Sequence, residues 1–200
     1  PVNREELSVL VVGLGNREIT PDALGPRVAD NMMITRHVIR EFGKYALGAE
    51  HSNLISSIVP GVMAQTGMES LEIIRGVIRE TEPDCIVAVD ALAARSVKRL
   101  NRTIQITNTG INPGSGVGNH RHGLNRESVG IPVIAIGVPT VVDAATIVND
   151  AISGYYEEVD CTLNSFFVTP KDIDESIKRL SFTISEGLNL AFEKTACTNS

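Results

Sequence analysis

Two aspartates in this chain stand where they could share one chemical step. Asp22 lies between a strand predicted at residues 8–13 and the helix predicted to follow it, and Asp90 closes an apolar strand predicted at residues 85–90. Two carboxylates held close together can share a proton, so that one serves as general base and the other as general acid when water attacks an amide. The same pair could instead chelate a divalent cation. The residues alone leave both chemistries open.

The position of Asp22 follows from the residues on either side of it. Residues 8–13 are apolar and rich in valine, as expected for a strand covered on both faces, and Pro26 suits the first turn of a helix because it has no amide hydrogen. A helix that starts near Ala23 or Leu24 leaves Asp22 just outside its N-terminus, at the sheet edge where open α/β folds bind ligands. The alternative is that Asp22 only caps this helix.

Gly13 and Gly15 could belong to a dinucleotide-binding turn, since they follow a strand and precede a helix. The fingerprint of such a site needs a third glycine three residues after the second, and this chain has Glu18 there. The carboxylate of Glu18 would oppose a pyrophosphate. We therefore expect no nucleotide cofactor.

No serine or cysteine stands in a recognisable nucleophile motif. Ser115 lies in a glycine-rich loop at residues 110–119, away from any strand-to-helix turn, and Cys85 lies inside an apolar strand. The dense glycines suit tight turns or the close approach of a ligand, and a flexible surface loop is the alternative. His120 and His122 could bind a metal, but we interpret them as part of an exposed basic loop.

Strands and helices alternate along the chain. Apolar or alternating runs predict strands at residues 8–13, 53–59, 85–90, 103–107 and 131–137. Apolar residues at helical spacing predict helices at residues 24–42, 68–82, 139–152 and 170–191. The last helix is predicted to start with Thr169 as its cap and Pro170 at its first position. This alternation predicts an α/β fold: a three-layer sandwich with a mainly parallel, mixed central sheet flanked by helices.

The composition is that of an ordinary globular protein. The chain has 18 Lys or Arg against 24 Asp or Glu, and this net charge of −6, together with the absence of Trp, argues against nucleic-acid binding. No apolar run approaches the roughly 18 residues of a membrane-spanning helix, and no signal-peptide pattern is present, so we expect a cytoplasmic protein without a membrane partner. The spacing of Cys85, Cys161 and Cys197 predicts neither a disulfide framework nor a zinc site.

Four blocks of sequence together resemble one known family. The blocks span residues 13–16 with 20–26, then 88–96, 112–119 and 136–144, and the likeness extends in order over most of residues 8–195. This set is similar to the bacterial spore germination proteases. The resemblance implies a peptidase whose fold is related to that of the hydrogenase maturation endopeptidases.

The resemblance also implies an activity and a site. Members degrade small acid-soluble spore proteins during germination, which implies an endopeptidase in the cytoplasm of the spore core that acts on a protein substrate. The catalytic role falls on Asp22 and Asp90 as an atypical aspartic-type pair without metal or cofactor, and which of them is the base stays open. Residues 1–200 would form a single α/β peptidase domain, without the N-terminal region that the zymogens of the family carry, and a homotetramer is expected.

Two other functions stay open at this point. In the related maturation endopeptidases, the acids aligned with Asp22 and Asp90 bind a metal together with a histidine, so a metal-dependent peptidase is one alternative. A non-catalytic fragment or assembly module is the other, because only about seven residues precede the first strand here.

Overall fold

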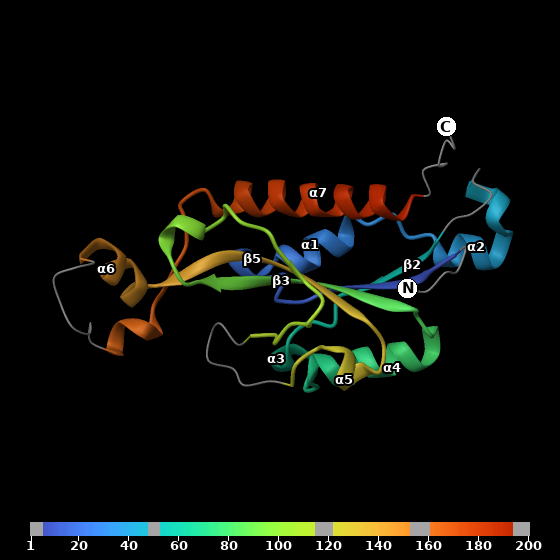
Figure 1. Cartoon of the computed structure of the whole chain (residues 1–200), viewed down its shortest axis with the longest axis horizontal. Coiled ribbons are helices and arrows are strands. Elements are labelled where there is room, and N and C mark those ends of the chain that lie inside the picture. Colours follow the sequence, from blue (N-terminus) through green and yellow to red (C-terminus); the bar gives the residue numbers. More distant parts are fainter. Residues whose placement is uncertain (1–5, 48–52, 115–121, 153–160, 194–200) are drawn as a thin grey trace.

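The computed structural model describes residues 6–47, 53–114, 122–152 and 161–193. A central sheet separates two helical layers, with α1 (Leu24–Asp30) and α7 (Ile173–Phe192) on one face and α3 (Met63–Thr66), α4 (Ser70–Thr81) and α5 (Arg126–Val129) on the other (Figure 1). We call these faces the α7 face and the α4 face. The predicted α/β sandwich is confirmed.

The sheet is mixed but mainly parallel. Its strands follow the order β2-β1-β3-β5-β4, in which β4 runs antiparallel to β5, and β6 pairs antiparallel with the far end of β5. The strands are β1 (Ser8–Gly13), β2 (Leu54–Ile58), β3 (Cys85–Ala94), β4 (Gln105–Thr107), β5 (Val133–Asp143) and β6 (Phe167–Val168).

Both faces of the inner strands are buried because side chains alternate along a strand. In β1, Val9 and Val11 join the core on the α7 face, whereas Leu10 and Val12 join the core on the α4 face. The apolar stripe of α7 closes the first of these cores, with Ile177 fully buried. The continuous apolar runs of the sequence therefore correspond to strands that are covered on both faces.

The predicted helix over residues 24–42 is wrong, because the chain forms two helices there. Helix α1 ends at Asp30, and α2 (Arg36–Phe42) begins only after Thr35. The Thr35 amide donates to the Ile55 carbonyl at 3.1 Å, and its hydroxyl oxygen accepts the Ile55 amide at 2.9 Å. These hydrogen bonds to β2 keep the segment between Asp30 and Arg36 from continuing as a helix.

The two central strands are longer than predicted. Residues 91–94, expected in a loop, continue β3, and residues 139–143, expected in a helix, continue β5. The register shifts between Leu92 and Ala93, which oppose Pro139 and Val141, so Thr140 is an extra residue on β5. Such a bulge tolerates the missing amide hydrogen of Pro139. Helix α6 (Ala144–Ile152) starts after this extension.

The start of α7 also differs from the prediction. The Thr169 hydroxyl donates to the Thr140 carbonyl at 3.0 Å instead of capping the helix, which begins at Ile173. The remaining short segments are 3₁₀ helices: η1 (Thr20–Asp22), η2 (Lys44–Leu47), η3 (Val97–Arg99) and η5 (Cys161–Ser165).

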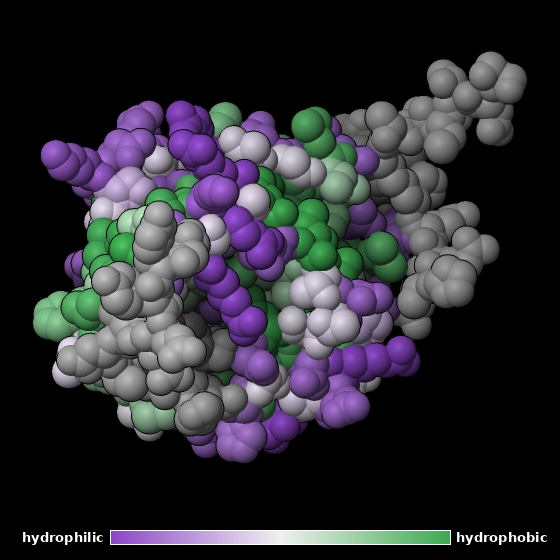
Figure 2. All heavy atoms as spheres, turned by 60° about the vertical axis from the view of Figure 1, so that its left-hand side comes forward, coloured by the Kyte–Doolittle hydropathy of each residue, from purple (hydrophilic) through white to green (hydrophobic). Residues whose placement is uncertain are grey.

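The exterior mixes apolar and polar side chains. Figure 2 brings the α6 end of the molecule forward and shows green apolar patches among purple polar ones. Exposed apolar side chains include Phe166, Phe167 and Val168. Within the described residues, none of the helices has the length and apolarity needed to cross a bilayer.

Candidate active site

The junction between β1 and α1 is built on two glycines. A Cβ on Gly25 would lie 2.3 Å from the Leu14 carbonyl oxygen and 2.4 Å from that of Val89, and a Cβ on Gly13 would lie 2.3 Å from the Gly25 carbonyl oxygen. The first turn of α1 therefore packs directly against the backbones of β1 and β3. Gly13, which could have belonged to a nucleotide-binding turn, instead serves close packing of strand and helix.

Asp22 ends the 3₁₀ turn η1, immediately before the cap residue of α1, which is Ala23. Its half-buried carboxylate accepts the Asn16 amide at Oδ2, at 2.7 Å. Gly15 has φ of +110°, and a Cβ there would lie 2.1 Å from the Asp22 carbonyl oxygen. The predicted place of Asp22 just outside the helix is confirmed. The N-cap residue of α1 is Ala23 and not Asp22.

Asp90 is buried, with 4% of its surface exposed, and its Oδ1 accepts the Ala91 amide at 2.9 Å. Although β3 continues to Ala94, the neighbouring strand β1 ends at Gly13, which pairs with Val89. Asp90 therefore lies one residue beyond the last pair of β1 and β3. The expected strand end is wrong for β3 itself, but the sheet edge formed with β1 does fall at this residue.

The elements that hold the two aspartates are neighbours in the fold. The turn η1 contacts β3, β5 and α7. Since Asp22 belongs to η1 and Asp90 to β3, both acids come from elements that meet at the carboxyl end of β1. This arrangement suits chemistry in which two carboxylates act on one substrate.

Thr140 is a polar residue in this region that the sequence analysis missed. Its side chain is 1% exposed, and among the described residues its Oγ1 has no hydrogen-bond partner. The side-chain amide atoms of Asn101 likewise have no hydrogen-bond partner among the described residues, and the Asn101 backbone amide donates to the Pro139 carbonyl at 2.8 Å. The sequence pattern predicts a helix at residues 139–152, and such a helix would place Thr140 outside the sheet. No feature of the sequence therefore marks Thr140 as a residue near the site.

The histidines do not join the aspartates where they are described. His122 Nδ1 lies 3.0 Å from Glu69 Oε2 and is exposed, as expected of a surface loop. His120 and Ser115 lie outside the described residues, as do residues 115–119 of the glycine-rich loop. Within the described part of the chain, His, Cys, Asp and Glu side chains form no group of three that could hold a metal.

Cys85 lies at the first position of β3, at the opposite end of the strand from the carboxyl edge. Burial, followed by the nearby charge of Asp84, raises the pKa of its thiol. A raised pKa keeps the thiol protonated and unreactive at neutral pH. The expectation that Cys85 is not a nucleophile agrees with this environment.

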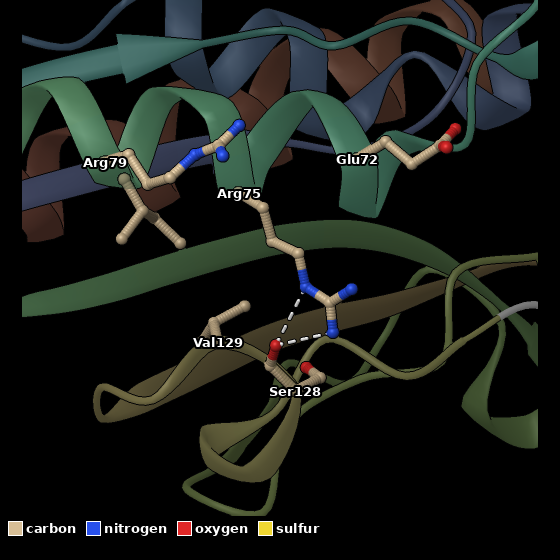
Figure 3. A pocket seen from close by; sticks show the side chains of 6 residues that line it. Glu72, Arg75, Arg79, Ser128 and Val129 are labelled. Carbon is tan, nitrogen blue, oxygen red and sulfur yellow. Dashed lines mark hydrogen bonds between the residues drawn. The ribbon is translucent and has the colours of Figure 1, made fainter.

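Two surface clefts do not include either aspartate. One, of about 420 Å³, lies between α4 and α5, where Arg75 donates from Nε and Nη2 to the Ser128 carbonyl at 3.0 and 2.8 Å (Figure 3). The other, of about 500 Å³, is lined by residues of α1 and α7 such as Arg27 and Phe182. Both clefts are lined by residues of neighbouring helices.

The sequence matches known peptidases along most of its length. The profile of the germination proteases matches residues 2–159. A germination protease from Caldanaerobacter subterraneus subsp. tengcongensis is 44% identical over 220 residues, covering 95% of this chain and 67% of that protein. One from Bacillus velezensis is 55% identical over 148 residues, covering 74% of this chain and 40% of that protein. These sequence matches define a peptidase. The chain belongs to the germination protease family, whose members are endopeptidases of spore germination.

Among solved structures, a hydrogenase maturation protease from Thermococcus kodakarensis KOD1 aligns with a TM-score of 0.44 at 19% identity. The alignment covers 90% of this chain and 92% of that one.

Proposed function

We propose that this protein cleaves small acid-soluble spore proteins and that Asp22 and Asp90 activate the attacking water. The observation that best supports the pair is the contact of η1 with β3, because it brings together the two elements that hold these acids. Both aspartates also fall within residues 2–159, the part of the chain that matches the family.

The two carboxylates differ in environment, as a base and an acid working in one step require. Asp22 is half-buried and accepts a backbone amide, whereas Asp90 is nearly closed off from solvent. In the proposed step, one carboxylate takes a proton as water oxygen bonds to the scissile carbonyl carbon. The other carboxylic acid then gives a proton to the departing nitrogen as the carbon–nitrogen bond breaks. Two carboxyl groups thus supply both proton transfers.

A metal-dependent reaction is the competing mechanism. Asp22 and Asp90 would supply two oxygen ligands of the kind that divalent cations bind. A third ligand from His, Cys, Asp or Glu is not grouped with them within the described residues. The proposal places the proton transfers on the two aspartates, and sensitivity to a chelator distinguishes it from the metal-dependent reaction.

The test is cleavage of a purified small acid-soluble spore protein by the wild type and by Asp22→Asn and Asp90→Asn. Either substitution keeps the shape of the side chain but removes its proton-transfer function, so we expect cleavage to fall by at least about a hundredfold. Asp174→Asn, an exposed aspartate in the first turn of α7, serves as the matched control and should leave the rate unchanged.

Three outcomes would contradict parts of this proposal. Wild-type rates in either Asn variant would remove that aspartate from the mechanism. Activity that is lost with a chelator and restored by a divalent cation would favour the metal-dependent peptidase. A wild-type protein that cleaves nothing would favour an assembly module.

Location and assembly complete the proposal. If small acid-soluble spore proteins are the substrate, the protein acts in the cytoplasm of the spore core. We also expect it to form a homotetramer. Sedimentation equilibrium of the purified protein measures the second point, since a tetramer would have four times the chain mass of 21.5 kDa.

A further inference from the structure

Asn16 lies at the centre of the hydrogen bonds around Asp22. Its backbone amide donates to Asp22 Oδ2 at 2.7 Å. Its side-chain Oδ1 accepts two bonds, from the Glu18 amide at 3.0 Å and from Gln65 Nε2 at 3.2 Å. The first of these forms a local Asx turn, and the second reaches a residue 49 positions away in the chain.

Gln65 lies in α3 and divides its amide between two partners. Its Oε1 accepts the Val62 amide at 3.4 Å, which closes the N-terminus of α3, while its Nε2 donates to Asn16. One exposed side chain therefore connects a short helix below the sheet to the loop beside Asp22. Its amide oxygen accepts a bond at the start of α3, and its amide nitrogen donates to the loop beside Asp22.

The loop that holds Asn16 needs such a connection because of the residue before it. Gly15 adopts φ of +110° and has no side chain to restrict it, so the peptide between Gly15 and Asn16 can rotate at low cost. That peptide contains the amide that points at Asp22. A bond from Gln65 to the side chain of Asn16 restricts this rotation.

We propose that Gln65 is a positioning residue for Asp22, acting through Asn16 without touching the substrate. The Gln65 amide nitrogen holds Asn16, and the Asn16 amide in turn holds Oδ2 of Asp22 and so sets the orientation of the carboxylate. This inference rests on the proposed catalytic role of Asp22. The substrate of this step is the extended segment of a protein chain that the peptidase cleaves.

The two ends of the Gln65 amide can be separated by substitution. Gln65→Glu keeps an oxygen for Val62 but has no hydrogen to give to Asn16. Gln65→Lys keeps a donor for Asn16 but offers no oxygen to Val62. Gln65→Met removes both functions without adding charge, and so controls for the charge of the other two variants.

The measurement is kcat and KM for cleavage of a purified small acid-soluble spore protein, with thermal unfolding of each variant. We expect Gln65→Glu and Gln65→Met to lower kcat about tenfold with KM unchanged, because a misdirected carboxylate affects the chemical step. Gln65→Lys should keep kcat within about twofold of the wild type, since it restores the donor.

A role confined to the stability of α3 would give the reverse order, with Gln65→Glu active and Gln65→Lys impaired. That order, equal losses in all three variants, or wild-type kcat in both Gln65→Glu and Gln65→Met would overturn the inference. Asp22→Asn, measured in parallel, separates the two levels. If it is inactive while the Gln65 variants fail the expected order, only the positioning role is wrong; if it is fully active, the proposed function of Asp22 is wrong.

Discussion

At the scale of single residues, Gly25 matters because it has no side chain. Three backbone atoms, two of Leu14 just after β1 and one of Val89 in β3, lie within 2.6 Å of the place where its Cβ would be. No rotamer change can relieve a clash with backbone, so either α1 or the strands would have to move. Because η1 and Asp22 directly precede α1, this packing also sets the position of the candidate site.

Gly25→Ala should destabilise the protein by about 3 kcal/mol or more, the upper part of the range for overpacking a tight core. The matched control is Gly187→Ala, at an exposed position of α7 with nothing within 4 Å of the added Cβ. This change should stabilise by about 0.5–1 kcal/mol, since alanine favours helix over glycine. Urea unfolding measures both. Equal effects of the two substitutions would show that the β1–α1 contact is looser than described.

The thiol of Cys85 should make stability depend on alkaline pH. Burial, with a smaller contribution from Asp84, raises its pKa in the folded state. Below the pKa of the unfolded thiol both states hold the proton and stability is unaffected. Above it the unfolded chain loses the proton first, so stability falls until the pH passes the folded pKa.

The free energy of unfolding should therefore decline more between pH 7 and about pH 10 in the wild type than in Cys85→Ala. Urea titrations at the two pH values measure this difference, and comparison of the two proteins cancels the titration of all other groups. A decline of equal size in both proteins would mean that the thiol has the same pKa folded and unfolded.

At the scale of elements, Thr35 decides that α1 and α2 are separate helices. Its hydroxyl donates to the Asn53 carbonyl and accepts the Ile55 amide, and its side chain is 7% exposed. Apolar residues from Leu24 to Ile39 keep a helical spacing through this point. Hydrogen bonds to β2 therefore outweigh a local pattern that would continue the helix.

Thr35→Val should cost about 1–3 kcal/mol, because it leaves two buried backbone groups of residues 53 and 55 without their partner. Thr183→Val in α7 removes the same kind of hydroxyl from an exposed helix position, where it donates only to the Arg179 carbonyl at 2.9 Å. That change should stay within about 0.5 kcal/mol. Thermal unfolding compares the two, and a Thr35→Val variant as stable as Thr183→Val would contradict the role assigned to Thr35.

The extension of β3 and β5 illustrates the same competition between local pattern and distant partner. Alanines at 91, 93 and 94 have low strand propensity, and Pro139 resembles a helix start, so each segment by itself indicates something other than a strand. Beyond the end of β1, β3 and β5 continue to pair with each other, and this pairing holds both segments in strand conformation. The bulge at Thr140 accommodates the proline.

At the scale of the whole molecule, the charge sets which partners are favoured. An excess of acidic residues gives a net charge of −6, which repels the phosphate backbone of nucleic acids. We expect a fluorescently labelled DNA duplex to show no change in anisotropy when the protein is added at 0.15 M salt. Binding that weakens steeply with added salt would instead reveal a basic surface strong enough to overcome the net charge.

The sequence determined the architecture and the candidates for chemistry. Apolar runs covered on two faces, helices with one apolar stripe and the order in which they alternate were sufficient for the α/β fold. Helix-start rules located Asp22, and the apolar strand ending on a carboxylate located Asp90. These features are local, so a window of ten to twenty residues contains them.

Only the tertiary structure decided how far the strands extend, where the first helical segment breaks and what holds the loop beside Asp22. Each of these depends on contacts between residues far apart in the chain: the strand pairing of Leu92 with Pro139, and the hydrogen bonds of Thr35 with Ile55 and of Asn16 with Gln65. Such contacts exist only once the layers have packed and brought their partners within reach. Local periodicity does not report them, which is why Gln65 and Thr140 emerged from the structure and the two aspartates from the sequence.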